Sequence, residues 1–264
     1  SIALANAKRN KKIHFFALEG AEYEIERRVK YQMIAERFYS MPSRPAVYLN
    51  YMDWYHGKLD QELSEIEDEI DSTPVLFPTL KTYYRGQSFT ATDFEKLFLG
   101  VKNETDLVVV DHLHHFDSDD DNENRAIKSI VKKISDCVLL AGTPVLLLAQ
   151  LRKRDKKSKQ LIPDLEDFYG SSDSGKIATQ AITLAPDFKN YNPNYRETYM
   201  QVVKCRVDGS RTQSVGLLKF NYPTQSYGKN YYLGSLSVDE SEFTPLDYSQ
   251  MPRWAINALA GGRS

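Results

Sequence analysis

The hydrophobic and polar positions of this chain follow two alternating patterns up to about residue 150. Unbroken apolar runs predict strands buried on both faces, and an apolar residue at every third or fourth position predicts an amphipathic helix. The predicted strands are Ile13–Leu18, Leu107–Asp111 and Val145–Ala149, with shorter ones at Ala46–Leu49 and Val75–Phe77. The predicted helices are Glu22–Tyr39, Leu59–Ile70, Ala91–Leu99 and about Asn124–Leu140. This alternation is typical of a parallel sheet with crossover helices.

The pattern changes after Gln150. A basic run is followed by Tyr169–Lys176, a segment of small residues that predicts a loop. Shorter alternating strands are predicted at Ala181–Leu184, Thr198–Arg206, Ser214–Phe220 and Tyr231–Leu233, and the turn at Asp208-Gly209 predicts an antiparallel hairpin. We therefore expect an α/β fold in which a central, mostly parallel sheet with flanking helices carries a C-terminal antiparallel extension. Residues 1–234 form one predicted domain and residues 235–264 a polar tail.

Composition narrows the class of protein. Hydrophobic residues make up 41% and charged residues 27% of the 264 residues, which is ordinary for a globular protein. The net charge of −2 means that any nucleic-acid binding has to come from a local basic patch. Two cysteines, Cys137 and Cys205, are too few for a disulfide framework and favour a reducing, cytoplasmic setting. No apolar run approaches the roughly 20 residues of a membrane span, so we expect no membrane association.

Each of the three longest apolar runs ends in a polar residue. Glu19 follows the first run, Asp111 ends the second and Gln150 follows the third. The carboxyl ends of parallel strands share one edge of a sheet, where open α/β sheets bind ligands, so we expect these side chains to gather there. Two carboxylates and an amide suit phosphoryl transfer, in which one carboxylate holds Mg²⁺ and the other activates a water. For Asp111 alone, a turn-forming residue after a strand is an equally good interpretation.

Four segments resemble, in order, the RecA-fold motor domain of hexameric DnaB-type replicative helicases and of the RepA-type plasmid helicases. Phe15–Gly20 resembles the strand with the catalytic glutamate, and Leu107–Leu113 resembles the Walker B strand. Leu146–Leu151 resembles the strand whose terminal Gln or His reads the nucleotide state, and Val203–Arg206 resembles the late strand with a lysine and an arginine finger. The resemblance covers roughly residues 1–235 and implies a RecA-like P-loop NTPase core.

The resemblance implies a role for each of these residues. Glu19 polarises the attacking water, Asp111 holds Mg²⁺ directly or through water, and Gln150 couples the γ-phosphate of ATP to the loops that follow. Arg206 reaches the nucleotide of the neighbouring subunit, and Lys204 assists from the same strand. From the pattern of residues alone, Lys204 and Arg206 are better explained as the exposed face of an edge strand.

The resemblance fails at one motif, because G-x-x-x-x-G-K-[ST] occurs nowhere in the sequence. The segment Gly170–Lys176 imitates its end, but Ile177 replaces the required Ser or Thr, and the segment follows the third long strand. It is interpreted as a DNA-facing loop, with Ser172 and Lys176 as contacts. The Ala- and Leu-rich start with its basic end is typical of the second half of a helix, so we expect the P-loop to precede Ser1 and these residues alone to be inactive.

A basic run follows the third long strand directly. In the family, loops at this place line a central channel and hold single-stranded DNA by its backbone, and lysine and arginine suit such a salt-sensitive grip. Repetition around a six-subunit ring would concentrate this charge, whereas the alternative is a solvated charged loop. The residues concerned are Arg152, Lys153, Arg154, Lys156, Lys157 and Lys159.

Histidines and acidic residues follow Asp111, but the spacing of His112, His114 and His115 beside residues 117–121 fits neither a zinc motif nor an EF-hand loop. We assign no metal there beyond Mg²⁺ at Asp111. The sequence thus predicts the motor domain of a ring-forming, ATP-dependent DNA helicase of DNA replication, which hydrolyses a nucleoside triphosphate while moving along single-stranded DNA. Two alternatives stay open: a RepA-like or recombination-type DNA-binding ATPase, and a RecA-fold scaffold without hydrolysis.

Overall fold

The computed structural model describes residues 2–72, 79–86, 88–151, 162–168, 172–188, 191–207, 215–237, 242–247 and 249. The chain forms two compact units. The first comprises Ser1–Arg152, Phe168–Ala178 and Tyr222–Ser226, and the second comprises Lys153–Asp167, Thr179–Asn221 and Tyr227–Ser264. The predicted strand at 75–77, the turn at 208–209 and most of the predicted tail lie outside the described residues. The domain boundary at residue 234 stays a prediction.

The first unit is built on a sheet of four parallel strands in the order β2-β1-β3-β4. The strands are β1 Ile13–Ala17, β2 Leu80–Tyr84, β3 Leu107–Asp111 and β4 Val145–Leu147. The parallel register pairs Ala17 with Asp111 and Val110 with Leu147, so the carboxyl ends of the three strands coincide. This arrangement confirms the predicted parallel sheet.

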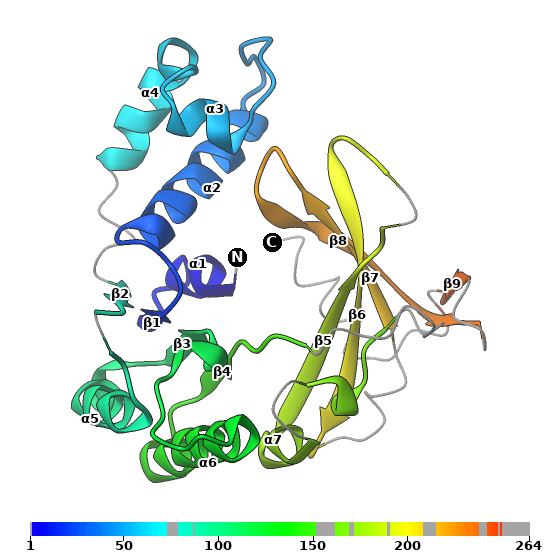
Figure 1. The fold of residues 1–264 in the computed structure, drawn as a ribbon. Helices are drawn as coiled ribbons and strands as arrows, with labels where there is room; N and C mark the ends of the chain where they lie inside the picture. Colours follow the sequence, from blue (N-terminus) through cyan, green and yellow to red (C-terminus); the bar gives the residue numbers. More distant parts are fainter. Residues whose placement is uncertain are drawn as a thin grey trace. The chain divides into compact units, whose positions relative to one another are not determined.

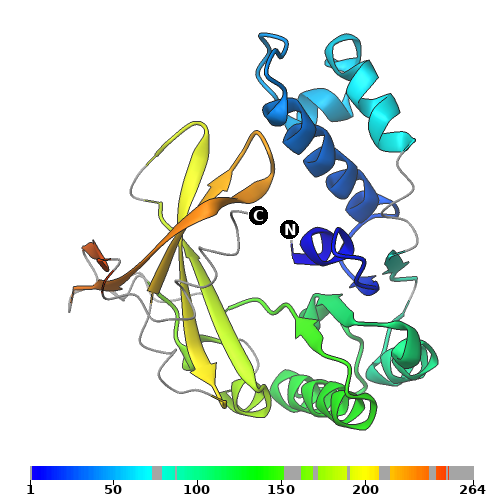
Figure 2. The same ribbon diagram turned by 180° about the vertical axis from the view of Figure 1, so that it is seen from behind.

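Helices cover both faces of this sheet (Figures 1 and 2). On one face, Phe16 and Val110 pack against buried residues of α5 Ala91–Val101 and α6 Glu123–Ala141. On the other, Ile13 and Val109 pack against α1 Ile2–Ala7 and α2 Glu24–Ser40. Successive strand residues thus point to opposite apolar layers, which explains why the strands are unbroken hydrophobic runs.

Capping signals in the sequence mark the start of α5 and the end of α6. Thr90 and Asp93 form a capping box at the start of α5, in which the Thr90 hydroxyl accepts from the Asp93 N–H and the Asp93 carboxylate accepts from the Thr90 N–H. Gly142 ends α6 with a φ of 71°, a left-handed conformation that glycine adopts without steric cost. These local signals fix where α5 begins and where α6 ends.

We expect Thr90→Ala to lower the free energy of unfolding by about 1 kcal/mol, because it leaves the backbone N–H of Asp93 at the start of α5 without its acceptor. Urea denaturation measures the change. Thr92→Ala, at an exposed position inside the same helix, is the control and is expected to be neutral or slightly stabilising, since alanine is the better helix former. An equal effect of the two substitutions would contradict the capping role.

The acidic helix α4 Asp60–Asp71 and the short helix α3 Tyr51–Tyr55 pack on the outer part of α2. Their shared cluster includes Tyr31 and Phe38 of α2 and Leu63 of α4, all fully buried. Charged residues of α4 face α2, where Glu69 accepts from Arg37 at 2.8 Å and Asp71 accepts from Lys30 at 2.9 Å. Exposed pairs of this kind contribute at most about 1 kcal/mol each, so the apolar cluster holds α4 in place.

The second unit is a five-stranded sheet in the order β5-β6-β7-β8-β9. Its strands are β5 Gln180–Pro186, β6 Tyr195–Cys205, β7 Val215–Asn221, β8 Ser226–Leu236 and β9 Phe243–Pro245. The β5–β6, β6–β7 and β8–β9 pairs are antiparallel. The predicted antiparallel extension is therefore confirmed, with longer strands than the sequence indicates.

Two local predictions are wrong, and one strand was not predicted. Ala46–Leu49 is not a strand, and Leu49 is apolar because it is buried among α2 and α4. The edge strand β2 was not predicted, since its half-buried residues lack a clear alternation. The predicted loop Tyr169–Lys176 contains most of a short helix, α7 Ser172–Ile177, whose Ile177 packs on the α5–α6 core layer. Within the described residues, no helix combines the length and the apolar character needed to cross a membrane.

Candidate active site at the carboxyl edge of the parallel sheet

Backbone pairing continues beyond the strands at the carboxyl edge of the sheet. The Leu18 N–H donates to the Asp111 carbonyl at 2.7 Å, and the Leu113 N–H donates to the Leu148 carbonyl at 2.9 Å. These bonds hold the segments after β1, β3 and β4 side by side, although each has left its strand. They bring Glu19, Asp111 and Gln150 to one edge, as the sequence predicts.

His112 joins two of these side chains directly. Its ring is buried, with 6% of the residue exposed, and its Nε2 lies 3.0 Å from Glu19 Oε2 and 3.2 Å from the side-chain nitrogen of Gln150. Glu19 itself is 58% exposed, so its carboxylate faces solvent while one oxygen is held from behind. The contact with His112 thus positions the exposed Glu19 carboxylate.

The hydrogen bonds around His112 define which ring nitrogen carries the proton. The His114 N–H donates to His112 Nδ1 at 3.3 Å, so Nδ1 is the acceptor and the proton of the neutral ring lies on Nε2. The Nε2–H then donates to Glu19 Oε2. The side-chain nitrogen of Gln150 lies 3.2 Å from the same ring nitrogen. His112 Nε2 is therefore the atom that both Glu19 and Gln150 contact.

Asp111 is the carboxylate next to this group. Burial raises its pKa, His112 lowers it, and the negative charges of Glu19 and Glu24 raise it further. The ionised form of Asp111 is thus destabilised by its surroundings, and a bound cation would relieve this cost. A hard carboxylate oxygen at the end of a strand is also the kind of ligand that Mg²⁺ prefers, so this residue fits the predicted metal.

The other residues of the loop after β3 have structural contacts of their own. The pKa of His114 is lowered by burial and by His112, which favours its neutral form. Asp117, the first of the acidic run, accepts from the Phe89 N–H at 2.7 Å and from Arg85 at 2.8 Å, and these partners lower its pKa. Asp117 thus fixes the loop, while residues 118–121 are exposed.

Comparison with solved structures identifies the fold. The chain aligns with a structure described as an ATPase domain at a TM-score of 0.58 and 15% identity, covering 93% of this chain and 78% of that one. It aligns with a DnaB-like replicative helicase, solved in a study of its interactions with primase, at a TM-score of 0.59 and 14% identity, covering 93% of this chain and 53% of that one. The chain has a RecA-like fold. No protein-family profile and no curated protein matches it.

Lys204 and Arg206 belong to the second unit, whereas Glu19, Asp111, His112 and Gln150 belong to the first. Lys204 is the penultimate residue of β6, where burial and the charge of Arg206 lower its pKa. Arg206 follows the strand, its backbone N–H donates to the Thr179 carbonyl at 2.9 Å, and its side chain is exposed. The backbone of Arg206 is thus held by the sheet, and its side chain is exposed.

The predicted DNA-binding residues divide into two sets. Arg152, Lys153, Arg154, Lys156, Lys157 and Lys159 lie outside the described residues. Ser172 begins α7, and Lys176 is exposed in its last turn, so both lie on a helix and not on the predicted loop. The residue between Gln150 and the basic run is described: Leu151 forms an antiparallel bridge with Phe168.

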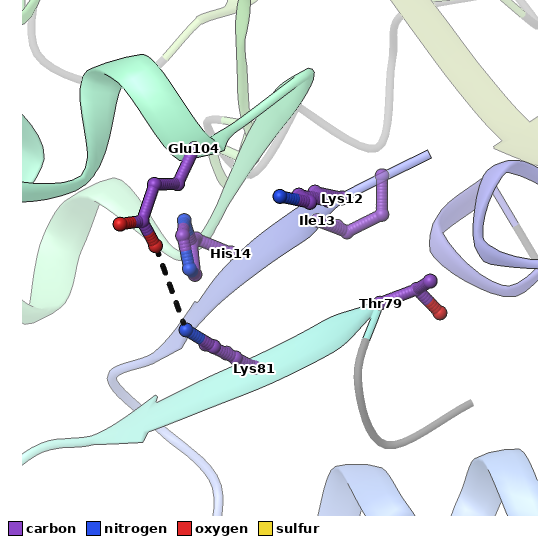
Figure 3. Close-up of a pocket in the computed structure, with 6 residues that line it drawn as sticks. All are labelled: Lys12, Ile13, His14, Thr79, Lys81 and Glu104. Atoms are coloured by element: carbon purple, nitrogen blue, oxygen red, sulfur yellow. Dashed lines mark ion pairs between the residues drawn. The ribbon is translucent and has the colours of Figure 1, made fainter. Parts of the chain in front are cut away.

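A small pocket lies at the opposite, amino end of the RecA-like sheet (Figure 3). Its volume is about 50 Å³, and the Nζ of Lys81 lies 3.9 Å from a carboxylate oxygen of Glu104 at its wall. Burial and the charge of Lys81 lower the pKa of His14 there. Sites for small molecules of drug size occupy about 300–1,000 Å³, so this pocket is too small for a nucleotide. It is lined by Lys12, Ile13, His14, Thr79, Lys81 and Glu104.

His112 is a candidate site residue that the sequence did not predict. The available signal was its position immediately after Asp111, at the tip of a buried strand. Its contact with Glu19 joins residues from two strands that are distant in the chain, and only the register of β1 and β3 makes that contact predictable.

Proposed function

We propose that this chain is the motor domain of a ring-forming, ATP-dependent DNA helicase, which couples nucleoside triphosphate hydrolysis to movement along single-stranded DNA. The observation that carries the proposal is the group at the carboxyl edge of the sheet, where His112 contacts both Glu19 and Gln150 beside Asp111. The RecA-like fold supports it, since the two solved structures are an ATPase domain and a DnaB-like replicative helicase.

In the proposed reaction, Glu19 accepts a proton from the water that attacks the γ-phosphate. The His112 N–H holds Oε2 at 3.0 Å, which leaves Oε1 of the exposed carboxylate for the water. Asp111 would hold Mg²⁺, which neutralises charge on the phosphate oxygens when bound. Gln150 contacts the same His112 nitrogen as Glu19, so a change in the contacts of the Gln150 amide would change how firmly Glu19 is held.

The remaining predicted residues act between subunits and on DNA. Arg206, with Lys204 behind it, would reach the nucleotide of a neighbouring subunit, which requires a ring, and six subunits are proposed. The basic run from Arg152 to Lys159, with Ser172 and Lys176, would hold the DNA backbone. The bridge between Leu151 and Phe168 supports a link between DNA binding and the nucleotide site. Leu151 directly follows Gln150, and the basic run begins at the next residue.

A second function is a RecA-fold scaffold without hydrolysis, which the lack of a G-x-x-x-x-G-K-[ST] motif in these residues would favour only if no such motif precedes Ser1 in the intact protein. Backbone N–H groups of that motif cradle the phosphates, and its lysine reaches the terminal ones. A recombination-type ATPase that binds DNA but unwinds little is the third possibility.

The decisive experiment measures ATP hydrolysis by the intact protein with Mg²⁺, with and without single-stranded DNA, together with strand separation on a forked duplex. Hydrolysis stimulated by single-stranded DNA and accompanied by strand separation is the expected result. Stimulated hydrolysis without separation supports the recombination-type ATPase. Nucleotide-independent DNA binding without hydrolysis supports the scaffold.

DNA affinity is also expected to fall steeply with salt, because lysine and arginine contacts to phosphates release counterions.

A further inference from the structure

Three side-chain atoms of the kind that bind metals meet outside the tip of the parallel sheet. They are Glu19 Oε2, His112 Nε2 and His115 Nε2, and all lie within 4.8 Å of one another. Glu19 Oε2 is 3.0 Å from His112 Nε2 and 3.9 Å from His115 Nε2. The centroids of the two imidazole rings are 4.5 Å apart. The group thus offers two nitrogens and one carboxylate oxygen around a common point.

A single turn of 3-10 helix explains why the two histidines face the same way. The turn η2 covers Leu113–His115, and the His115 N–H donates to the His112 carbonyl at 3.1 Å. In a 3-10 turn, side chains three positions apart are eclipsed, so those of His112 and His115 fall on one side. Leu113 is buried and its N–H is bonded to Leu148, which fixes the turn against β4.

The separations of these atoms match the requirements of a tetrahedral metal ion. Zinc–nitrogen and zinc–oxygen bonds of about 2.0–2.2 Å place neighbouring ligand atoms about 3.3–3.6 Å apart. The observed 3.0 and 3.9 Å lie on either side of this value, so small rotations of the exposed Glu19 side chain and of His115 would equalise them. Imidazole nitrogens suit zinc, nickel and cobalt, whereas Mg²⁺ takes oxygen ligands.

We propose that Glu19, His112 and His115 form a binding site for a divalent transition metal ion of the zinc class, with water as the fourth ligand. Binding at His112 Nε2 requires the ring proton to move to Nδ1. The contact of Nδ1 with the His114 N–H must then lengthen, and at 3.3 Å it is already a long hydrogen bond. The metal replaces the Nε2 proton as the partner of the Glu19 carboxylate.

This site has a consequence that rests on the proposed function. A metal ion on Glu19 Oε2 adds positive charge to the carboxylate and makes Oε1 a weaker base toward the attacking water, so bound zinc would inhibit hydrolysis without occupying the nucleotide site. A chelator would then restore the activity. Binding of the metal itself depends only on the three ligands and not on hydrolysis.

The test uses Co²⁺ as a probe, because its visible absorption reports tetrahedral coordination without any enzymatic assay. Titration of the intact protein is expected to give one tetrahedral Co²⁺ per chain, displaced by Zn²⁺. His115→Ala removes a half-exposed ligand and is expected to weaken binding by on the order of 10–100-fold or more, since loss of even an outer-shell partner costs that much. His56→Ala, at an exposed histidine after α3, is the matched control and should change nothing.

A second variant protects the test against misfolding. His112 is buried, so its replacement also disturbs packing, whereas Glu19→Gln alters an exposed side chain and removes the anionic ligand. It is expected to weaken Co²⁺ binding as well. Absent tetrahedral absorption, or equal affinity in the unchanged protein and the His115→Ala variant, would overturn the site even if ATP is hydrolysed. Tetrahedral Co²⁺ in a protein that never hydrolyses ATP would leave the site standing and overturn the proposed function.

Discussion

Glu19→Gln is expected to slow ATP hydrolysis by about 10²–10⁴-fold while nucleotide binding persists, which is the range over which a positioned general base acts. The amide keeps the shape of the side chain and can still accept the His112 N–H bond, so the local structure is retained. It cannot take a proton from water. Steady-state hydrolysis measures the first effect, and equilibrium binding of a labelled nucleotide measures the second.

Glu22→Gln provides the matched control for this experiment. Glu22 is an exposed carboxylate three residues further along the chain, so its replacement removes the same charge from the same loop. Hydrolysis by that variant is expected to be unchanged. Equal rates for the Glu19→Gln variant and the unchanged protein would remove Glu19 from the proposed mechanism.

Arg206→Ala is expected to lower the hydrolysis rate by about 10³–10⁵-fold, the contribution found for arginine fingers. The proposed finger acts on the nucleotide of the neighbouring subunit, so the defect should be complemented in mixed rings. A subunit with Arg206→Ala still has its own Glu19, and a subunit with Glu19→Gln still has its own Arg206. Random mixing in equal amounts should restore about a quarter of the sites, because each site takes one residue from each neighbour.

Arg196→Ala is the control for the loss of charge in the second unit. Arg196 lies on the same strand, β6, where its guanidinium stacks over the Phe188 ring at 4.7 Å. Its replacement is expected to leave hydrolysis within a few-fold of the unchanged rate. Mixed rings that stay as slow as the Arg206→Ala rings would show that Arg206 does not act across subunits.

Signals carried by neighbouring residues were sufficient to predict most of the first unit. The unbroken run Leu107–Asp111 becomes a central strand because both of its faces meet apolar layers. Thr90 starts α5 and Gly142 ends α6 for reasons of local hydrogen bonding and backbone geometry. The convergence of Glu19, Asp111 and Gln150 was also predictable, since parallel strands in register bring their carboxyl ends to one edge.

Features that depend on distant packing could not be predicted in the same way. The segment of α7 is rich in Gly and Ser, which favours a loop, and packing of Ile177 against the α5–α6 layer outweighs that preference. Leu49 is apolar because it faces helices and not a sheet. The proposed role of His112 depends on a contact with Glu19 across two strands, and the proposed site with His115 depends on a 3-10 turn that no periodicity in the sequence indicates.

The bridge between Leu151 and Phe168 has a consequence for how such a protein changes during evolution. When the two ends of a loop are held together, the loop can lengthen or shorten at small thermodynamic cost. Doubling the length of a loop raises the free-energy cost of closing it by only about 0.6 kcal/mol. Insertions and deletions between these two residues would leave the position of Gln150 unaltered. A change in the number of residues between Leu151 and Phe168 would therefore leave the chemistry at the sheet edge the same.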